Sequence, residues 1–108
     1  MQIERPREHR CPFVARIELT DVESGLQTTV NTVNLSLSGC QVQKQLTLPA
    51  GSKVRVRIVH RGDKFIALGR IANVQLDGET GITFTGVETT DRATLDKWLA
   101  ESRTDGRR

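Results

Sequence analysis

The sequence lacks any apolar run long enough to cross a membrane. Of its 108 residues, 36% are hydrophobic and 27% are charged, and no stretch approaches the ~20 apolar residues that a membrane-spanning helix needs. Residues 1–10 are polar and charged, without the apolar segment of a secretory signal. We therefore expect one cytoplasmic globular domain that does not insert into membranes.

Aromatic side chains are scarce, since the chain has three phenylalanines, one tryptophan and no tyrosine. Proteins that bind single-stranded nucleic acids stack bases on such side chains, so a nucleic acid polymer is not an expected partner. Potential metal ligands are equally few. The only histidines are His9 and His60, and Cys11 and Cys40 do not form a Cys-x-x-Cys pair. Hence no metal site and no cofactor is predicted.

Reactive groups are also few. Cys11 and Cys40 are expected to be free thiols in a reducing compartment. The alternative is a redox disulfide, which requires the two residues to lie close together in the fold. The sequence has no phosphate-loop motif and no Ser, His and Asp grouping typical of a hydrolase. These absences predict a binding module rather than an enzyme.

Short alternating segments fill most of the chain. Apolar and polar side chains alternate from Phe13 to Leu19 and from Lys53 to His60, with the period of two of a half-buried strand. Hairpin turns are predicted at Arg61–Lys64 and at Asp77-Gly78, and Gly69 indicates a bulge. The remaining predicted strands cover residues 26–35, 40–45, 65–76 and 81–87.

The period changes after the last predicted strand. Leu95, Trp98 and Leu99 follow i, i+3, i+4 spacing, which predicts a helix over residues ~90–102. Thr90 is the expected N-cap and Asp91 a favourable charge in the first turn. Trp98 is interpreted as the residue that packs this helix on the strands, in preference to a ligand contact.

Six strands and one helix predict an all-β fold, a small antiparallel six-stranded β-barrel with one C-terminal α-helix. Strand pattern alone does not distinguish this barrel from an OB-fold or an SH3-like barrel. The expected organisation is a flexible Arg-rich arm at residues 1–11, the barrel with its helix at residues 12–102 and a frayed tail at residues 103–108.

Two polar clusters could carry a function. The N-terminal arm contains Arg5, Arg7 and Arg10, and residues 34–39 read Asn-Leu-Ser-Leu-Ser-Gly. Taken singly, the arm is compatible with a solvated terminus. The second cluster is compatible with an ordinary turn in which Asn and Ser bond their own backbone.

Together the clusters resemble the PilZ domain family, which pairs an N-terminal Arg-x-x-x-Arg motif with a downstream Asp/Asn-x-Ser-x-x-Gly motif. The resemblance extends to Gly69-Arg-Ile71, to Gly81-Ile-Thr-Phe84 and to the terminal helix. It implies a bacterial receptor for the second messenger cyclic di-GMP. Such a receptor would signal through an unidentified effector protein, as a monomer or weak dimer.

The resemblance also implies a binding site. Guanidinium groups of the arm would hold phosphate oxygens and the O6/N7 edge of guanine, and Asn34 would bond the remaining guanine edge. Ser36 would contact the ligand or hold the turn, and Gly39 would let the backbone turn tightly. The implied ligand-binding residues are Arg5, Arg7, Arg10, Asn34, Ser36 and Gly39.

Two positions depart from the family pattern. Aligned on Arg10, the first arginine of the motif falls at Pro6, which donates no hydrogen bond and fixes φ near −65°. Asn73 stands where family members often carry an aromatic residue. A degenerate adaptor that binds no nucleotide is therefore the alternative function. An unrelated small-barrel interaction or RNA-binding domain is the third.

A further basic group lies on the outward face of the strand at residues 53–60. The net charge of the chain is +3, and 12 of its 16 basic residues are arginines. Lys53, Arg55 and Arg57 share one face because strand side chains alternate. They are interpreted either as a solvated face that blocks strand aggregation or as a docking surface for an acidic protein, with nucleic acid a more distant option.

Overall fold

The computed structural model describes residues 10–43, 46–74 and 78–106. The predicted arm residues 1–9, and with them Arg5 and Arg7, lie outside these ranges. The elements in chain order are β1 (Cys11–Pro12), β2 (Arg16–Asp21), β3 (Gln27–Leu35), β4 (Gly39–Val42), β5 (Lys53–His60), β6 (Asp63–Val74), β7 (Thr80–Val87) and α1 (Thr89–Gly106).

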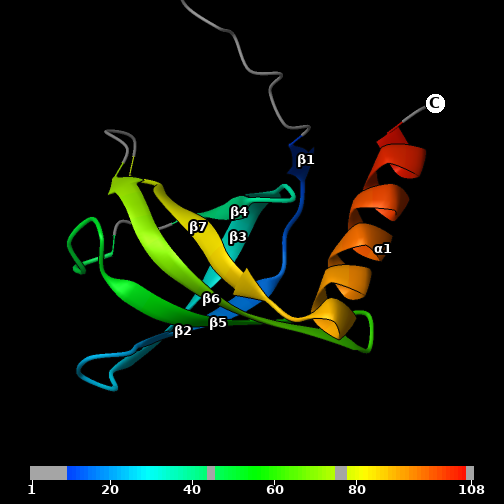
Figure 1. Cartoon of the computed structure of the whole chain (residues 1–108). Coiled ribbons are helices and arrows are strands. Elements are labelled where there is room, and N and C mark those ends of the chain that lie inside the picture. The colour runs from blue at the N-terminus through cyan, green and yellow to red at the C-terminus, as the bar shows by residue number, and fades with distance from the viewer. Residues whose placement is uncertain (1–9, 44–45, 75–77, 107–108) are drawn as a thin grey trace, which may run out of the picture.

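Six strands close into an antiparallel barrel (Figure 1). The order is β3-β2-β5-β6-β7-β4, and a further pairing of β4 with β3 closes the ring. The two-residue strand β1 pairs with β3 alongside. The predicted all-β fold, a six-stranded barrel followed by one helix, is confirmed.

Strand β5 shows how the sequence pattern builds the barrel. Val54, Val56 and Ile58 are fully buried, while the residues between them are exposed. The turn into β6 has positive φ at both Arg61 (53°) and Gly62 (83°). Such a pair of angles makes the type I′ turn that joins twisted antiparallel strands, so the predicted hairpin is confirmed.

The first long strand begins later than predicted. Phe13 and Ala15 are buried and Val14 is 72% exposed, so the expected alternation holds, but strand pairing begins only at Arg16. The cause is Thr32, whose Oγ1 accepts from the Ala15 N–H at 2.9 Å and donates to the Phe13 carbonyl at 2.6 Å. A buried hydroxyl thus replaces part of the regular backbone ladder.

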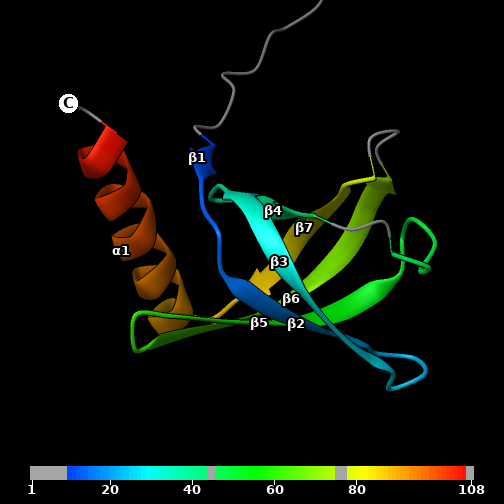
Figure 2. The same ribbon diagram turned by 180° about the vertical axis from the view of Figure 1, so that it is seen from behind.

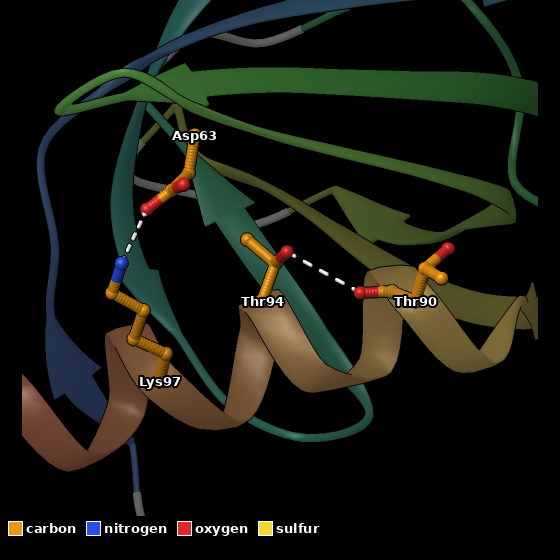
Figure 3. Close-up of polar contacts among 4 residues, drawn as sticks. All are labelled: Asp63, Thr90, Thr94 and Lys97. Atoms are coloured by element: carbon orange, nitrogen blue, oxygen red, sulfur yellow. Dashed lines mark hydrogen bonds and ion pairs between the residues drawn. The ribbon is translucent and has the colours of Figure 1, made fainter.

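The helix is longer than predicted at both ends. Glu88 is its N-cap, because its carbonyl accepts the Arg92 N–H at 2.8 Å, so the assignment of Thr90 as the cap is wrong. Thr90 lies inside the first turn, where its carbonyl accepts from the Thr94 hydroxyl at 3.3 Å (Figure 3). The helix continues past residue 102 to Gly106, the first glycine after β7 and a residue type that commonly ends helices.

The helix packs on one side of the barrel, beside β1 and the β5–β6 turn (Figures 1 and 2). Its apolar residues Leu95, Trp98 and Leu99 are buried as predicted. At the surface, Lys97 Nζ lies 2.9 Å from Oδ2 of Asp63, the first residue of β6 (Figure 3). This contact raises the pKa of Lys97, mainly through the hydrogen bond to Asp63.

Trp98 anchors an aromatic cluster between helix and barrel. Its ring centroid lies 5.4 Å from Phe13, 5.5 Å from His60 and 6.2 Å from Phe65. The interpretation of Trp98 as a packing residue is confirmed. Burial, and then the positive charge of Arg61, lower the pKa of His60 below 6.5.

The cysteines are free and buried, as predicted. Cys11 and Cys40 both lie opposite Leu35, one on β1 and the other on β4. They are therefore separated by two strand spacings, roughly 10 Å. A disulfide needs Cα atoms within about 7 Å, so the redox-disulfide alternative does not fit this fold.

Within the described ranges, no helix combines the length and the hydrophobicity needed to span a bilayer. The same part of the chain contains no group of three or more His, Cys, Asp or Glu residues placed to hold a metal ion.

Candidate functional site

A small cleft lies where β3, β4, β6 and β7 meet. Its volume is about 180 Å³. Arg10 reaches it from the residue before β1. The lining residues are Arg10, Asn34, Ser36, Ser38, Gly39, Cys40, Gln41, Ala72, Gly81, Ile82 and Thr83. Four of the six predicted site residues, from both sequence clusters, therefore line one cleft.

The β3–β4 turn forms one wall of the cleft. The Ser36 N–H donates to the Gly39 carbonyl at 2.8 Å, and the Ser36 hydroxyl donates to the same oxygen at 3.3 Å. Ser36 is buried. Its side chain therefore holds the turn, which was one of the two roles predicted for it.

Gly39 is needed because two backbones approach closely. A Cβ built on Gly39 would lie closer to the Ile82 carbonyl oxygen on β7 than any van der Waals contact permits. Gly39 does not have positive φ, so its role is this close approach and not a left-handed turn conformation. Phe84 N–H donates to the Ser38 carbonyl at 2.7 Å and fastens the turn to β7.

Gln41 joins the two sequence clusters. Its Oε1 accepts a hydrogen bond from Asn34 Nδ2, and Arg10 Nη1 lies 3.4 Å from the same oxygen. An Asn amide has a second N–H and a carbonyl oxygen, and a guanidinium has further donors. The contact with Gln41 therefore orients Arg10 and Asn34 while leaving each with groups that can bond a ligand.

Gln41 was not among the predicted site residues. The signal that identifies it is strand register, because Gln41 lies directly opposite Asn34 in the β3–β4 hairpin. That register follows once Ser36–Gly39 is taken as the connecting turn. The side chain of Asn73, the second departure from the family pattern, lies outside the described side chains, although its backbone pairs with Gly81.

Cys40 lines the cleft but contributes no reactive group. Burial raises the pKa of its thiol to about 12. Because the thiolate is the nucleophilic form of cysteine, this thiol is inert near neutral pH. The chemistry available in the cleft is therefore hydrogen bonding from a cation, an amide and backbone groups.

This arrangement suits an anionic ligand with polar edges. The guanidinium of Arg10 can make paired hydrogen bonds to phosphate or to the O6/N7 edge of a guanine. Asn34 can donate and accept on a neighbouring edge.

The comparison with protein families gives one match, to the PilZ domain over residues 4–101. A search of curated proteins finds no match.

Solved structures with the same fold include three relatives of low sequence identity. The PilZ domain of CeSA from a cellulose-synthesizing bacterium is 21% identical with a TM-score of 0.71, over 86% of this chain and 96% of that one. The PilZ domain of YcgR from Escherichia coli, with c-di-GMP, is 13% identical with a TM-score of 0.73, over 96% and 95%. The Bacillus subtilis inhibitor of motility MotI/DgrA is 14% identical with a TM-score of 0.80, and the match covers 98% of this chain but only 55% of that one.

The family match includes the residues that build the cleft and all elements of the barrel. This chain therefore belongs to the PilZ domain family.

Proposed function

We propose that this protein is a receptor that binds cyclic di-GMP and relays the signal through contacts with another protein. The observation that carries the proposal is the convergence of Arg10 with Asn34 and the Ser36–Gly39 turn in one cleft. A solved PilZ domain of the same fold contains c-di-GMP. The proposal describes a non-enzymatic binding module of the bacterial cytoplasm.

The ligand would meet groups suited to its chemistry. Cyclic di-GMP has two phosphates and two guanines, and its acceptor atoms match the Arg10 guanidinium. Asn34 would pair with a guanine edge, beside the donors and acceptors of the turn. Gln41 would hold both side chains in place before the ligand arrives.

The cleft is too small to enclose the whole ligand, so part of it would lie outside. A volume of about 180 Å³ is smaller than the roughly 300–1,000 Å³ of sites that enclose a drug-sized ligand. One guanine or phosphate would enter the cleft, and the rest would lie on the barrel surface. Arg5 and Arg7, on the arm next to Arg10, are the residues proposed to cover it.

Calorimetric titration tests this function. Cyclic di-GMP is expected to bind with measurable heat, whereas GTP and cyclic di-AMP, which share a base type or the cyclic backbone, are expected to bind at least roughly tenfold more weakly, about 1.4 kcal/mol. Equal binding of all three would reject a specific guanine site.

The second candidate is a degenerate adaptor that acts through protein contacts alone. The specific observation in its favour is Pro6, which stands where the family motif has its first arginine. An adaptor would show no cyclic di-GMP binding at concentrations of about 100 μM, that is, an affinity weaker than about −5.5 kcal/mol. That result would contradict the receptor proposal and favour the adaptor.

A further inference from the structure

One outer wall of the barrel is strongly basic. Along β2, β5 and β6, every second side chain points into the core and the side chains between them point outward. These outward side chains form one surface. We call this surface the basic wall. Its exposed basic residues are Arg16, Lys53, Arg55, Arg57, Lys64 and Arg70. The excess of positive charge on this wall is larger than the net charge of +3 on the whole chain.

Strand register brings these cations together. Lys53 lies opposite Arg70 across the β5–β6 ladder, and Arg57 lies opposite Glu18 across β2–β5. Glu18 is the one acidic residue among the outward side chains of these strands in the described chain, and its Oε1 lies 3.4 Å from Arg57 Nη1. The remaining cations of the wall form no ion pair with described residues. Like charges on one face repel each other, and a negatively charged partner would relieve that repulsion. The wall is therefore expected to attract such a partner.

An apolar centre interrupts the charge. Leu68 lies opposite Arg55 on β6 and is 49% exposed. Beside it is an open groove with a volume of about 600 Å³. The groove is lined by Arg55, Ile66, Ala67, Leu68, Gly86, Val87, Glu88, Thr89 and Asp91.

The two ends of the groove differ in charge. Arg55 lies at the β5 end, and Glu88 and Asp91 lie at the helix end. The Asp91 carboxylate already accepts the Ile66 N–H at 2.9 Å. A partner would therefore place its negative charges over β5 and keep them away from the start of α1.

The basic wall is separate from the candidate ligand cleft. The groove and the cleft share no lining residue, and none of the six basic residues of the wall lines the cleft. Solvent-exposed cations around an exposed leucine suit an acidic segment that also carries apolar side chains. Exposed aromatic side chains, on which nucleic acid bases stack, do not occur in the described part of the wall.

We propose that the basic wall is the docking surface for an acidic, leucine-containing segment of a partner protein. Negative side chains of that segment contact Lys53 and Arg55, and one apolar side chain packs on Leu68 in the adjoining groove. The proposal goes beyond ligand binding, and it holds for a receptor and for an adaptor alike.

The test uses a synthetic peptide of glutamates interrupted by leucines, titrated into the 15N-labelled chain of residues 1–108. Amide shifts are expected along β5 and β6, with little change in the β3–β4 turn. The double charge reversal Lys53→Glu and Arg55→Glu is expected to weaken peptide binding at least roughly tenfold. This loss of affinity is expected to be larger at low salt, where charges are screened least. Arg92→Glu, an exposed reversal on α1, is the matched control and is expected to change affinity by less than about twofold.

A second pair of variants tests the apolar contact without changing charge. Leu68→Ser is expected to weaken peptide binding by at least roughly threefold. Leu26→Ser, at a leucine that is 70% exposed in the β2–β3 turn, is expected to have no effect. Thermal unfolding of each variant shows that the barrel is intact.

Three comparison probes give outcomes that overturn the proposal. Binding of an all-glutamate peptide as tight as that of the leucine-containing peptide removes the role of Leu68. Tighter binding of an oligothymidylate of equal charge assigns the wall to nucleic acid, and tighter binding of vesicles of phosphatidylserine and phosphatidylcholine assigns it to a membrane surface. Peptide shifts confined to the ligand cleft, or no shift at all, reject the wall as a peptide-docking surface.

Discussion

At the scale of single residues, Arg10 is the side chain on which ligand binding is expected to depend most. It is exposed and held at the rim of the cleft by its 3.4 Å contact with Gln41. Arg10→Ala is expected to weaken cyclic di-GMP binding by at least ~1.5 kcal/mol, because a hydrogen bond to a charged group is lost. Asn34→Ala is expected to cost less, about 0.5–1.5 kcal/mol, since a neutral group is removed.

Calorimetry on the two variants, with Arg92→Ala on the helix as the control, measures both losses. If removing Asn34 weakens binding more than removing Arg10, the assignment of the charge-assisted contact is wrong. If neither variant changes affinity, the ligand binds elsewhere on the chain.

Gly39 illustrates a residue whose role is steric. Its Cα faces the Ile82 carbonyl across β4 and β7, and an added Cβ would clash with that backbone. Gly39→Ala is expected to lower the free energy of unfolding by about 1–3 kcal/mol, as overpacked sites usually do. Gly86→Ala is the matched control, since its Cβ would meet Leu68 at an ordinary 3.7 Å. Urea unfolding of both variants checks the prediction, and an equal loss in both would contradict it.

The sequence predicted four of the eleven residues that line the cleft, but not the separate role of each. Arg10, Asn34, Ser36 and Gly39 were implied by the family resemblance, and the structure brings all four together. Gln41 was missed because its role depends on cross-strand register, which motif matching does not use. The steric role of Gly39 depends on the path of β7, more than forty residues away in the chain.

At the scale of elements, the junction between β6 and α1 depends on Asp91. Strand β7 pairs with β6 up to Val87, opposite Ala67. The next β6 amide, that of Ile66, donates instead to Asp91 Oδ1 at 2.9 Å. The first turn of the helix thus continues the hydrogen bonding along the edge of β6. Asp91 therefore has a second role, in addition to the favourable interaction with the helix dipole predicted from the sequence.

Asp91→Ala would leave the Ile66 N–H without its acceptor. The expected loss in the free energy of unfolding is about 1–3 kcal/mol, the usual cost of an unsatisfied buried group, less where water replaces the acceptor. Asp96→Ala, at an exposed position of the same helix, is expected to change stability by less than about 0.5 kcal/mol. Faster hydrogen exchange at Ile66 in Asp91→Ala alone would identify the lost contact, and unchanged exchange there would contradict it.

The aromatic junction around Trp98 predicts a pH dependence of stability. The pKa of His60 is lowered in the folded protein, first by burial and then by Arg61, with Glu101 and Asp63 acting in the opposite sense. At pH values below about 6.5 the unfolded chain therefore binds more protons at this position than the folded one, and stability falls as the pH falls.

Melting temperatures measured from about pH 7.5 to about pH 5.5, across the ordinary histidine pKa of about 6.5, test this effect. The wild-type melting temperature is expected to fall with acidification by more than that of His60→Gln. The variant loses ring packing at every pH, so the comparison is of slopes and not of absolute values. Parallel slopes would show that His60 does not contribute to the pH dependence.

Element boundaries were the part of the fold that sequence predicted least well. The shift of the first long strand from 13–19 to Arg16–Asp21 comes from the Thr32 hydroxyl on the neighbouring strand β3, which bonds Phe13 and Ala15. The helix start at Thr89 is set by the Glu88 carbonyl, although Thr90 has the better side chain for an N-cap. In both cases a contact made in the fold overrides the local preference.

At the scale of the whole molecule, alternation and turn residues were sufficient to predict the barrel. Buried positions in β5 follow the period of two, and Gly69 lies at a register shift between β6 and β7, as predicted. The pattern predicted a barrel without naming the strands that close it, and in the structure β3 pairs with β4 to close the ring. The strand pattern did not identify the kind of barrel, and the family resemblance supplied that information.

Substitution of Pro6, a residue outside the described ranges, is expected to separate a receptor from an adaptor. The family motif has an arginine at this position, and proline there removes a guanidinium and restricts φ. Pro6→Arg is expected to tighten cyclic di-GMP binding by roughly tenfold, the value of one hydrogen bond to a charged group. Pro6→Ala is the control that releases φ without adding charge, and it is expected to give only a small part of this gain.

Calorimetry on the two variants and the wild type distinguishes three cases. A receptor with a weakened arm binds in all three forms and most tightly as Pro6→Arg. An adaptor that has lost only the first arginine binds cyclic di-GMP in the Pro6→Arg form alone. That result would show that the change at residue 6 is what abolished binding. If Pro6→Arg binds no more tightly than Pro6→Ala, a guanidinium at residue 6 does not reach the ligand. The arm contribution would then have to come from Arg5 or Arg7, which flank the proline.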